Sequence, residues 1–155
     1  MAQLNIRPAT ENDEEMLLRE SKVMIAESPR FREANFDDVK ASKEVMTAVG
    51  YGGVFIAEED GNFVGMLCGG IRDTWFGADL MGYDLFVYVA PSHRGGLALY
   101  FLVRRFEEWC WENGADTIDL GVITGIHPDK TIKAYGKLGY ELQSFACTKA
   151  NPRKE

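Results

Sequence analysis

The hydrophobic pattern at the start of the chain changes its period once. Apolar and polar side chains alternate over residues 4–9, which predicts a short first strand. Apolar residues then recur at helical spacing at Met16, Leu17, Val23 and Met24. We expect a helix with its N-cap at Thr10, an incomplete capping box at Asp13 and an end near Pro29. A second helix is expected over about residues 37–48, before a run of glycines.

Three apolar stretches in the middle of the chain predict an antiparallel meander. Residues 54–59 and 62–70 are separated by Asp60-Gly61, and these residue types supply the positive φ angles of a tight hairpin turn. A looser loop over residues 74–78 leads into a third apolar stretch over residues 80–89. We therefore expect three consecutive strands.

The second half of the chain alternates between helix and strand. A helix is expected over residues 97–113, where apolar residues recur at helical spacing. We expect a strand over residues 118–123, a helix over 129–138 and a final strand over 141–148. The order β-α-α-β-β-β-α-β-α-β predicts an α+β fold with an α/β-type mixed sheet, in which the strands before and after the long helix run parallel. Residues 1–150 are expected to form a single domain, followed by a tail over residues 151–155.

Composition and charge limit the function. The length of 155 residues and the hydrophobic fraction of 46% are typical of one globular domain. The net charge of −7 argues against a surface that binds nucleic acid. The acidic residues over 11–44 either form a solvated helix face or produce an electrostatic field that attracts a cationic acceptor. No membrane-length apolar run or secretory leader pattern is visible, so we expect a cytoplasmic location. The three cysteines, Cys68, Cys110 and Cys147, lie far apart and have no histidine at ligand spacing, so we expect no metal site. Cys68 and Cys110 lie inside apolar elements, and we expect both to be buried thiols.

The segment 87–99 joins an apolar strand to a helix through a short basic turn that contains Gly95 and Gly96. A strand, a glycine turn and a helix N-terminus in this order direct consecutive backbone N–H groups toward one anion. The glycines leave room for the anion because they have no Cβ. The segment therefore predicts a phosphate-binding turn.

Two motifs, in this order of elements, resemble those of the GNAT superfamily of acyl-CoA-dependent N-acetyltransferases. The run His93-Arg94-Gly95-Gly96-Leu97-Ala98 is similar to the family's pyrophosphate loop, Q/R-x-x-G-x-G/A, with His93 in place of the usual Gln or Arg. The run Ala134-Tyr135-Gly136-Lys137-Leu138-Gly139-Tyr140 is similar to the family's Y-x-x-x-G-F segment. The resemblance spans nearly the whole chain, and it implies the GNAT fold with a central sheet splayed between the fourth and fifth strands.

The resemblance also implies that coenzyme A binds in this splay. Backbone groups of Val87 and Val89 would hold the pantetheine arm, although both residues also fit a plain core strand. The pyrophosphate would be bound by the N–H groups of Arg94, Gly95, Gly96, Leu97 and Ala98. The side chain of Arg94 either adds a phosphate contact or caps a surface turn. His93 departs from the family pattern, so its side chain is either a ligand or an exposed loop residue.

Tyr135 falls where the family has its general acid, so the resemblance implies that its phenol protonates the departing thiolate of coenzyme A. A tyrosine that only anchors the helix to the sheet would fit the same position. Asp84 is the first candidate for the general base, because burial in an apolar strand raises the pKa of a carboxyl group. A strand-end aspartate bonded to the backbone is the alternative reading. Further candidates are Glu58, Glu59 and Asp119, and the family also uses water chains in place of a single base.

We therefore expect an N-acetyltransferase that moves an acetyl group from acetyl-CoA to a primary amine by direct attack, with no metal. The alternative is a GNAT-fold coenzyme A-binding or partner-docking protein with little or no turnover. The acceptor, a small molecule or a protein, is left open, and no nucleic-acid or membrane partner is expected. The resemblance also implies that edge strands could pair to form a homodimer. His127 and Lys130 either touch the ribose or 3′-phosphate of the cofactor or are exposed polar loop residues. The aromatic loop residues either shape an acceptor pocket or cover the sheet edge: Tyr51, Trp75 and Phe76.

Overall fold

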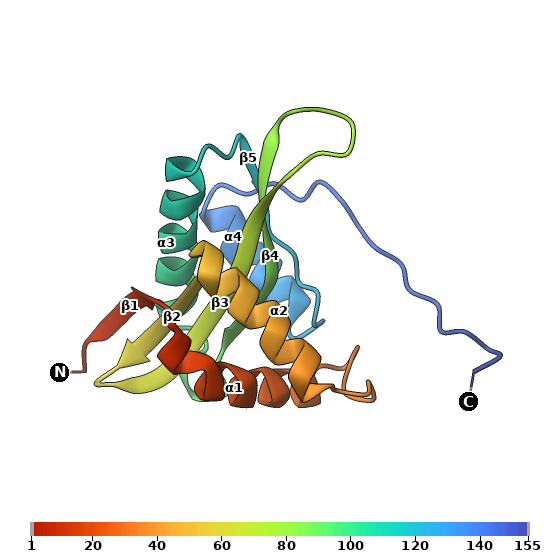
Figure 1. Cartoon of the computed structure of the whole chain (residues 1–155), viewed down its shortest axis with the longest axis horizontal. Coiled ribbons are helices and arrows are strands. Elements are labelled where there is room, and N and C mark those ends of the chain that lie inside the picture. The colour runs from red at the N-terminus through yellow and green to blue at the C-terminus, as the bar shows by residue number, and fades with distance from the viewer. Residues whose placement is uncertain (1, 155) are drawn as a thin grey trace.

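A single mixed sheet forms the centre of the molecule. The computed structural model describes residues 2–154, so the first residue of the expected domain and the last residue of the expected tail lie outside the described residues. The sheet has five strands in the order β1-β2-β3-β4-β5. Helices α1 and α2 pack on one face of the sheet, and α3 and α4 pack on the other (Figure 1). The predicted α+β class with a mixed sheet is confirmed.

The N-terminal part follows the predicted order of strand, helix and helix. β1 (Leu4–Pro8) leads into a 3₁₀ turn (Glu11–Asp13), then α1 (Glu14–Glu27) and α2 (Asp38–Tyr51). Thr10 and Asp13 form a complete capping box, which places the entry to the helix at the predicted residue. α2 ends at Gly52, whose φ of 89° lies in the left-handed region that glycine adopts without strain.

The predicted meander is confirmed as three antiparallel strands, β2 (Val54–Glu59), β3 (Asn62–Asp73) and β4 (Leu80–Val89). Asp60 and Gly61 have φ angles of 52° and 80°, as a tight primed turn requires. Between β3 and β4 the register moves from Cys68 opposite Phe86 to Gly69 opposite Asp84. Leu85 is therefore an extra residue in β4, and it forms a β-bulge.

The crossover after β4 brings the fifth strand alongside it in parallel. A 3₁₀ turn (Pro91–His93) precedes α3 (Ala98–Glu112), which is followed by β5 (Thr117–Asp119) and α4 (Pro128–Lys137). The parallel pairing of β4 and β5 confirms the prediction. β5 is shorter than the expected strand over residues 118–123, because the N–H of Gly121 donates to the carboxylate of Asp84 and not to a strand backbone.

Two apolar clusters fill the space between the sheet and its helices. Phe106 and Leu102 of α3 are fully buried against one face, and Leu17 of α1 is fully buried against the other. No described helix has the length and apolar character needed to cross a membrane.

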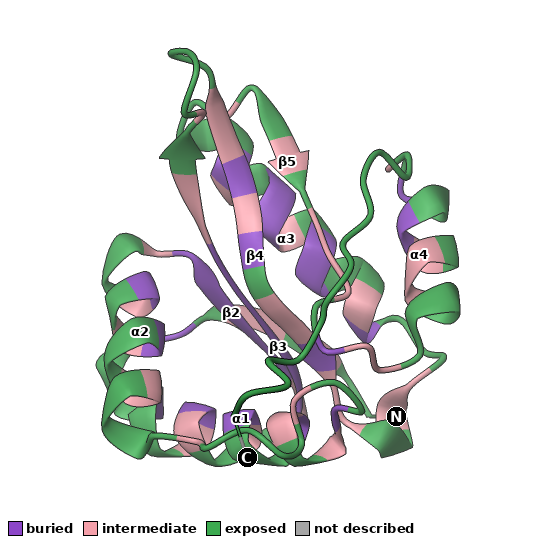
Figure 2. Ribbon diagram, turned by 90° about the vertical axis from the view of Figure 1, so that its right-hand side faces the viewer, coloured by how far each residue is buried: buried purple, intermediate pink, exposed green. Residues whose placement is uncertain are grey.

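The expected final strand over residues 141–148 is wrong. Residues 141–154 form no regular secondary structure and are exposed throughout (Figure 2). A strand is defined by the hydrogen bonds that it makes with a neighbour, and the described sheet contains no strand that pairs with this segment. We call residues 141–154 the C-terminal arm.

Candidate active site

The site opens where β4 and β5 separate. β4 pairs with β5 only over Met81–Tyr83, and it then continues to Val89 with no neighbour on that side in the described sheet. The N–H of Ala90 donates to the carbonyl of Val64 at 2.8 Å, which marks these two as a hydrogen-bonded pair. Because such pairs alternate along an antiparallel ladder, the peptide groups of Val89 and Val87 turn away from β3 toward the open edge. This orientation is the one that their expected role toward pantetheine requires; the role itself stays a prediction.

The glycine turn follows directly from this open edge. Gly95 has a φ of 85°, and a Cβ at Gly95 would meet no atom within 4 Å. α3 begins at Ala98 without a side-chain cap. Within residues 2–154, the N–H groups of Gly95, Gly96 and Leu97 donate to no backbone carbonyl. Free N–H groups in open space at the positive end of a helix dipole fit a diphosphate.

The side chain of Arg94 is held by both α1 and the end of β4. Its guanidinium donates to both carboxylate oxygens of Glu27, the last residue of α1, at 2.5 and 2.8 Å. Its Nε donates to the carbonyl of Val89 at 2.9 Å. The ion pair lowers the pKa of Glu27 and raises that of Arg94. Arg94 therefore crosses the open edge of β4 and holds the glycine turn to α1.

Sequence reasoning missed Glu27 because 67 positions separate it from Arg94, and no local pattern connects the two. His93, in contrast, faces away from this pair. Its Nδ1 lies 3.0 Å from the hydroxyl of Ser92, and its Nε2 lies 3.6 Å from the carboxylate of Glu59.

Asp84 and Tyr135, the first candidates for base and acid, meet on one peptide group. The N–H of Gly121 donates to Asp84 Oδ1 at 2.9 Å, and the hydroxyl of Tyr135 donates to the carbonyl of Gly121 at 3.4 Å. Both side chains are buried. Since the β4–β5 ladder ends at Tyr83 and Asp119, this cluster sits at the point where the two strands begin to separate.

Burial sets the protonation of this pair. It raises the pKa of Asp84 to about 6, against the opposing effect of the Gly121 N–H, and the negative charge of Asp119 adds to the rise. Burial and the charge of Asp84 both raise the pKa of Tyr135, so its phenol keeps its proton at neutral pH. A phenol that stays protonated can donate, and a carboxyl group with a pKa near 6 can accept a proton at neutral pH.

The other candidate bases have different surroundings. Glu58 accepts a hydrogen bond from Arg7 at 2.9 Å on the β1–β2 side of the sheet. Glu59 faces His93, and Asp119 is exposed on β5. None of the three is hydrogen-bonded to the Gly121 peptide group.

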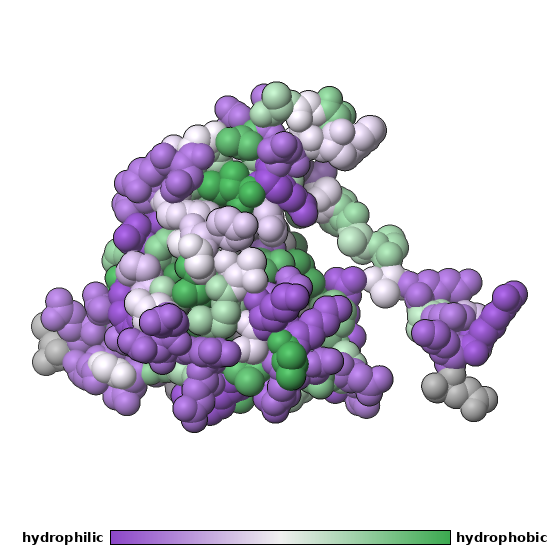
Figure 3. All heavy atoms as spheres, in the orientation of Figure 1, coloured by the Kyte–Doolittle hydropathy of each residue, from purple (hydrophilic) through white to green (hydrophobic). Residues whose placement is uncertain are grey.

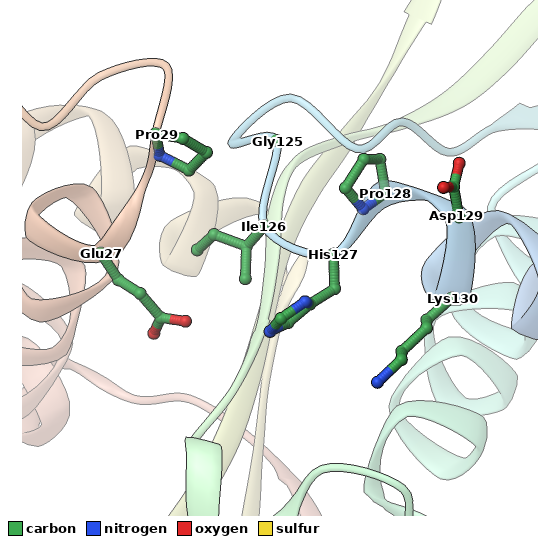
Figure 4. Close-up of a pocket in the computed structure, with 8 residues that line it drawn as sticks. All are labelled: Glu27, Pro29, Gly125, Ile126, His127, Pro128, Asp129 and Lys130. Atoms are coloured by element: carbon green, nitrogen blue, oxygen red, sulfur yellow. The ribbon is translucent and has the colours of Figure 1, made fainter.

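A pocket of about 540 Å³ lies between the end of α1 and the connection from β5 to α4 (Figure 4). Glu27 lines it from α1, and His127 and Lys130 line it from the start of α4, so both loop residues singled out in the sequence reach this pocket. His127 has a φ of 43°, a strained conformation for a residue with a Cβ. Buried Ser28 joins the two walls, because its hydroxyl donates to the carbonyl of Thr124 at 2.5 Å.

The exposed aromatic residues do not gather at this pocket. Trp75 and Phe76 lie at the tip of the β3–β4 connection, beyond the opposite end of β4 from the glycine turn (Figure 1). Tyr51 is exposed at the end of α2. Cys68 and Cys110 are buried, as expected, and burial raises the pKa of each thiol to about 12. Within residues 2–154, no group of three or more His, Cys, Asp or Glu is placed to hold a metal ion.

Comparison with solved structures finds several acetyltransferases of the same fold. The aminoglycoside N-acetyltransferase AAC(6')-Iy in complex with CoA superposes with a TM-score of 0.74 at 18% identity, over 98% of this chain and 97% of the other. A predicted acetyltransferase with acetyl-CoA from Clostridium acetobutylicum gives a TM-score of 0.71 at 18% identity, over 96% of both chains. Glucosamine-6-phosphate N-acetyltransferase from Arabidopsis thaliana gives 0.68 at 16% identity, over 96% and 98%. No curated protein sequence matches the chain.

These structural matches show the shared fold, and the sequence adds the family. Residues 17–140 match the family model described as the acetyltransferase (GNAT) family, which covers most of the chain. The matched range contains both motifs on which the resemblance rested, the glycine turn and the segment around Tyr135. The chain therefore belongs to the GNAT acetyltransferase family.

Proposed function

We propose that this protein is an acyl-CoA-dependent N-acetyltransferase that moves an acetyl group from acetyl-CoA to a primary amine by direct attack. The observation that carries the proposal is the open edge of β4, whose outward peptide groups at Val87 and Val89 lead straight into the glycine turn. An extended pantetheine arm would pair with this edge as an added strand does, while the free N–H groups at 95–97 bind the diphosphate.

Asp84 and Tyr135 would then carry the proton transfers. The amine nitrogen bonds to the thioester carbonyl carbon and the carbon–sulfur bond breaks. Asp84 accepts the proton that the amine loses, and Tyr135 donates a proton to the departing sulfur. Peptide groups freed from the ladder at the Leu85 bulge would polarise the thioester carbonyl. The buried position of both side chains keeps water from competing for these protons.

A panel of amines, assayed by release of the coenzyme A thiol, tests the proposal. The panel includes aminoglycosides and glucosamine 6-phosphate, because structural neighbours carry those acceptors in their names. We expect turnover with at least one amine. A protein that is stabilised by acetyl-CoA but acetylates no amine and no protein of a cell extract would contradict the enzyme and favour the docking protein.

The variant Tyr135→Phe identifies the proton donor. It keeps the ring in the core and removes only the hydroxyl, so we expect kcat to fall by about 10²-fold or more while the thermal shift caused by acetyl-CoA is unchanged. Tyr140→Phe is the matched control, because its ring lies 5.9 Å from that of Tyr135 and its hydroxyl bonds to no part of the Gly121 peptide. Equal kcat for Tyr135→Phe and the wild type would remove the donor role.

A further inference from the structure

The C-terminal arm is tied back to the body of the molecule by the side chain of Arg30. The arm runs outside the body, and the space-filling view shows its end as a separate file of residues (Figure 3). Arg30, on the connection between α1 and α2, donates to the hydroxyl of Thr148 at 2.9 Å and to the carbonyl of Ile123 at 3.2 Å. The same guanidinium lies over the ring of Phe31, 4.8 Å from its centroid. One held side chain therefore brings Thr148 of the arm next to Ile123.

The position of Ile123 places this contact close to the proposed chemistry. Ile123 lies two residues after Gly121, and two residues of chain span at most about 7 Å. The Gly121 peptide group is the one that bonds both Asp84 and Tyr135. Thr148 is thus held beside the end of the β5–α4 connection at which we expect the thioester to be attacked.

The residue that follows Thr148 is a lysine. Lys149 is exposed, and its ammonium group takes part in none of the ion pairs found within residues 2–154. Its amine sits on a flexible four-carbon stem, and its Cα lies about 3.8 Å from that of Thr148. A tethered group of this kind has an effective concentration of about millimolar. The chain therefore presents a primary amine of its own to the site.

We propose that Lys149 is acetylated by the active site of its own chain. The proposal rests on the proposed function, because it uses the same transfer from acetyl-CoA. The Lys149 ammonium group first releases one proton to water, and the free amine then bonds to the thioester carbonyl carbon while the carbon–sulfur bond breaks. Asp84 accepts the second proton, which balances the one that Tyr135 donates to the sulfur, and coenzyme A leaves as the thiol. The product is an uncharged amide that is no longer a nucleophile, so each chain consumes one acetyl group.

Mass spectrometry of the full chain, incubated with acetyl-CoA and no added amine, tests the proposal. We expect one thiol released per chain, and one acetyl group that peptide mapping places on Lys149. Lys149→Arg keeps the positive charge and should abolish both signals, whereas Lys154→Arg, further along the same arm, should change neither. Modification that falls mainly on another lysine, or that proceeds equally fast in Tyr135→Phe, overturns the proposal.

Thr148→Val tests the tether, because it removes the hydroxyl that Arg30 holds and keeps the shape of the side chain. We expect acetylation of Lys149 to slow several-fold while the thermal shift caused by acetyl-CoA is unchanged. Thr148→Ser keeps a hydroxyl and should retain most of the wild-type rate. An unchanged rate in Thr148→Val would show that the contact with Arg30 does not present the lysine, and it overturns the proposal.

A mixing experiment separates transfer within one chain from transfer between chains. Isotope-labelled Tyr135→Phe, which keeps Lys149, is incubated with unlabelled Lys149→Arg, which keeps Tyr135, and with acetyl-CoA. We expect the labelled chain to stay unmodified, and its acetylation would overturn transfer within the chain. A wild-type protein that acetylates an amine of the panel but leaves Lys149 unmodified overturns this inference and leaves the proposed function standing. Absence of both transfers overturns the two together.

Discussion

At the residue scale, the chemistry of the site rests on a carboxyl group that is buried and still bonded to a backbone N–H. For Asp84 the folded-state pKa of about 6 lies above the ordinary value of 3.8, so the folded chain holds this proton more tightly than the unfolded chain. The contribution of Asp84 to stability is therefore fully present below pH 3.8 and is lost as the pH rises through about 6. A shift of this size corresponds to about 3 kcal/mol.

The variant Asp84→Asn keeps an oxygen that accepts from Gly121 and removes the titration. We expect its free energy of unfolding, relative to wild type, to rise by up to about 3 kcal/mol between pH 4 and pH 7 in urea titrations. If Asp84 is the base, the variant also loses acetyl transfer and with it the fall in kcat/KM below pH 6. Asp119→Asn is the control, since that side chain is exposed and contacts Asp84 only through its charge. A wild-type acid limb retained in Asp84→Asn would assign the limb to another group.

The ion pair between Arg94 and Glu27 lies at the edge of β4 that we propose for the cofactor. Arg94 Nε donates a hydrogen bond to the Val89 carbonyl, which is one of the backbone groups on the edge that pantetheine would use. In Glu27→Gln the guanidinium loses its charged partner, so we expect the free protein to be destabilised by about 1 kcal/mol, a modest value because both side chains are partly exposed. We also expect acetyl-CoA to bind several-fold more tightly, measured by calorimetry.

Glu15→Gln provides the comparison, because this exposed residue lies on the same helix and away from the pair. Weaker binding of acetyl-CoA to Glu27→Gln would mean that Glu27 holds Arg94 in place for the cofactor and does not compete with it.

At the scale of elements, the path of β3 and β4 depends on a residue without a side chain. A Cβ at Gly69 would lie 2.4 Å from the carbonyl oxygen of Tyr83 and 2.7 Å from the ring of Phe106, which is fully buried. Neither the strand backbone nor a packed ring yields easily, so we expect Gly69→Ala to destabilise the fold by about 1–3 kcal/mol or more. Thermal denaturation measures the effect.

Gly50→Ala is the matched control for this prediction. Gly50 lies within α2, has no positive φ, and a Cβ there would meet nothing within 4 Å. Alanine in a helix interior is favoured over glycine by about 0.5–1 kcal/mol, so the control should be neutral or slightly stabilising. A Gly69→Ala protein as stable as Gly50→Ala would show that the strands shift to make room.

Local signals explain which elements the sequence could predict. Asp60-Gly61 and the glycine turn at Gly95 are short motifs whose conformation follows from their own residue types, and both form as expected. The early end of β5 could not be seen, because a side chain from another strand, Asp84, takes the N–H that a ladder would use. The arm has a strand sequence, but strand formation depends on a partner that lies outside its own local sequence.

Some features of the candidate site could likewise be predicted from local sequence, whereas others depend on the fold. The backbone positions at Val87, Val89 and Gly95 were recoverable because strand order and a glycine motif fix them. The meeting of Asp84 and Tyr135 on one peptide required the fold. Contacts between distant segments, such as Arg94 with Glu27, carry no periodicity and no motif, so only the folded chain shows them.

At the scale of the whole molecule, one buried hydroxyl joins the two walls of the pocket. Ser28 ends α1, and its Oγ donates to the Thr124 carbonyl of the β5–α4 connection while accepting from the N–H of Phe31 at 3.0 Å. Ser28→Ala leaves the buried Thr124 carbonyl and the partly buried Phe31 N–H without their partner, at a cost of about 1–3 kcal/mol. Because Glu27 lines this pocket and pairs with Arg94 of the glycine turn, we expect the thermal shift caused by acetyl-CoA to shrink together with the melting temperature.

Ser42→Ala separates this coupling from the general effect of losing a serine hydroxyl. Ser42 also bonds through its Oγ, to Glu14 at 2.6 Å, but between two helices at the surface and away from the pocket. Its variant should stay within about 0.5 kcal/mol of wild type and keep the full shift with acetyl-CoA. A Ser28→Ala protein that melts earlier but binds acetyl-CoA as tightly as wild type would show that the pocket walls hold their positions without this bond, and that Ser28 serves stability alone.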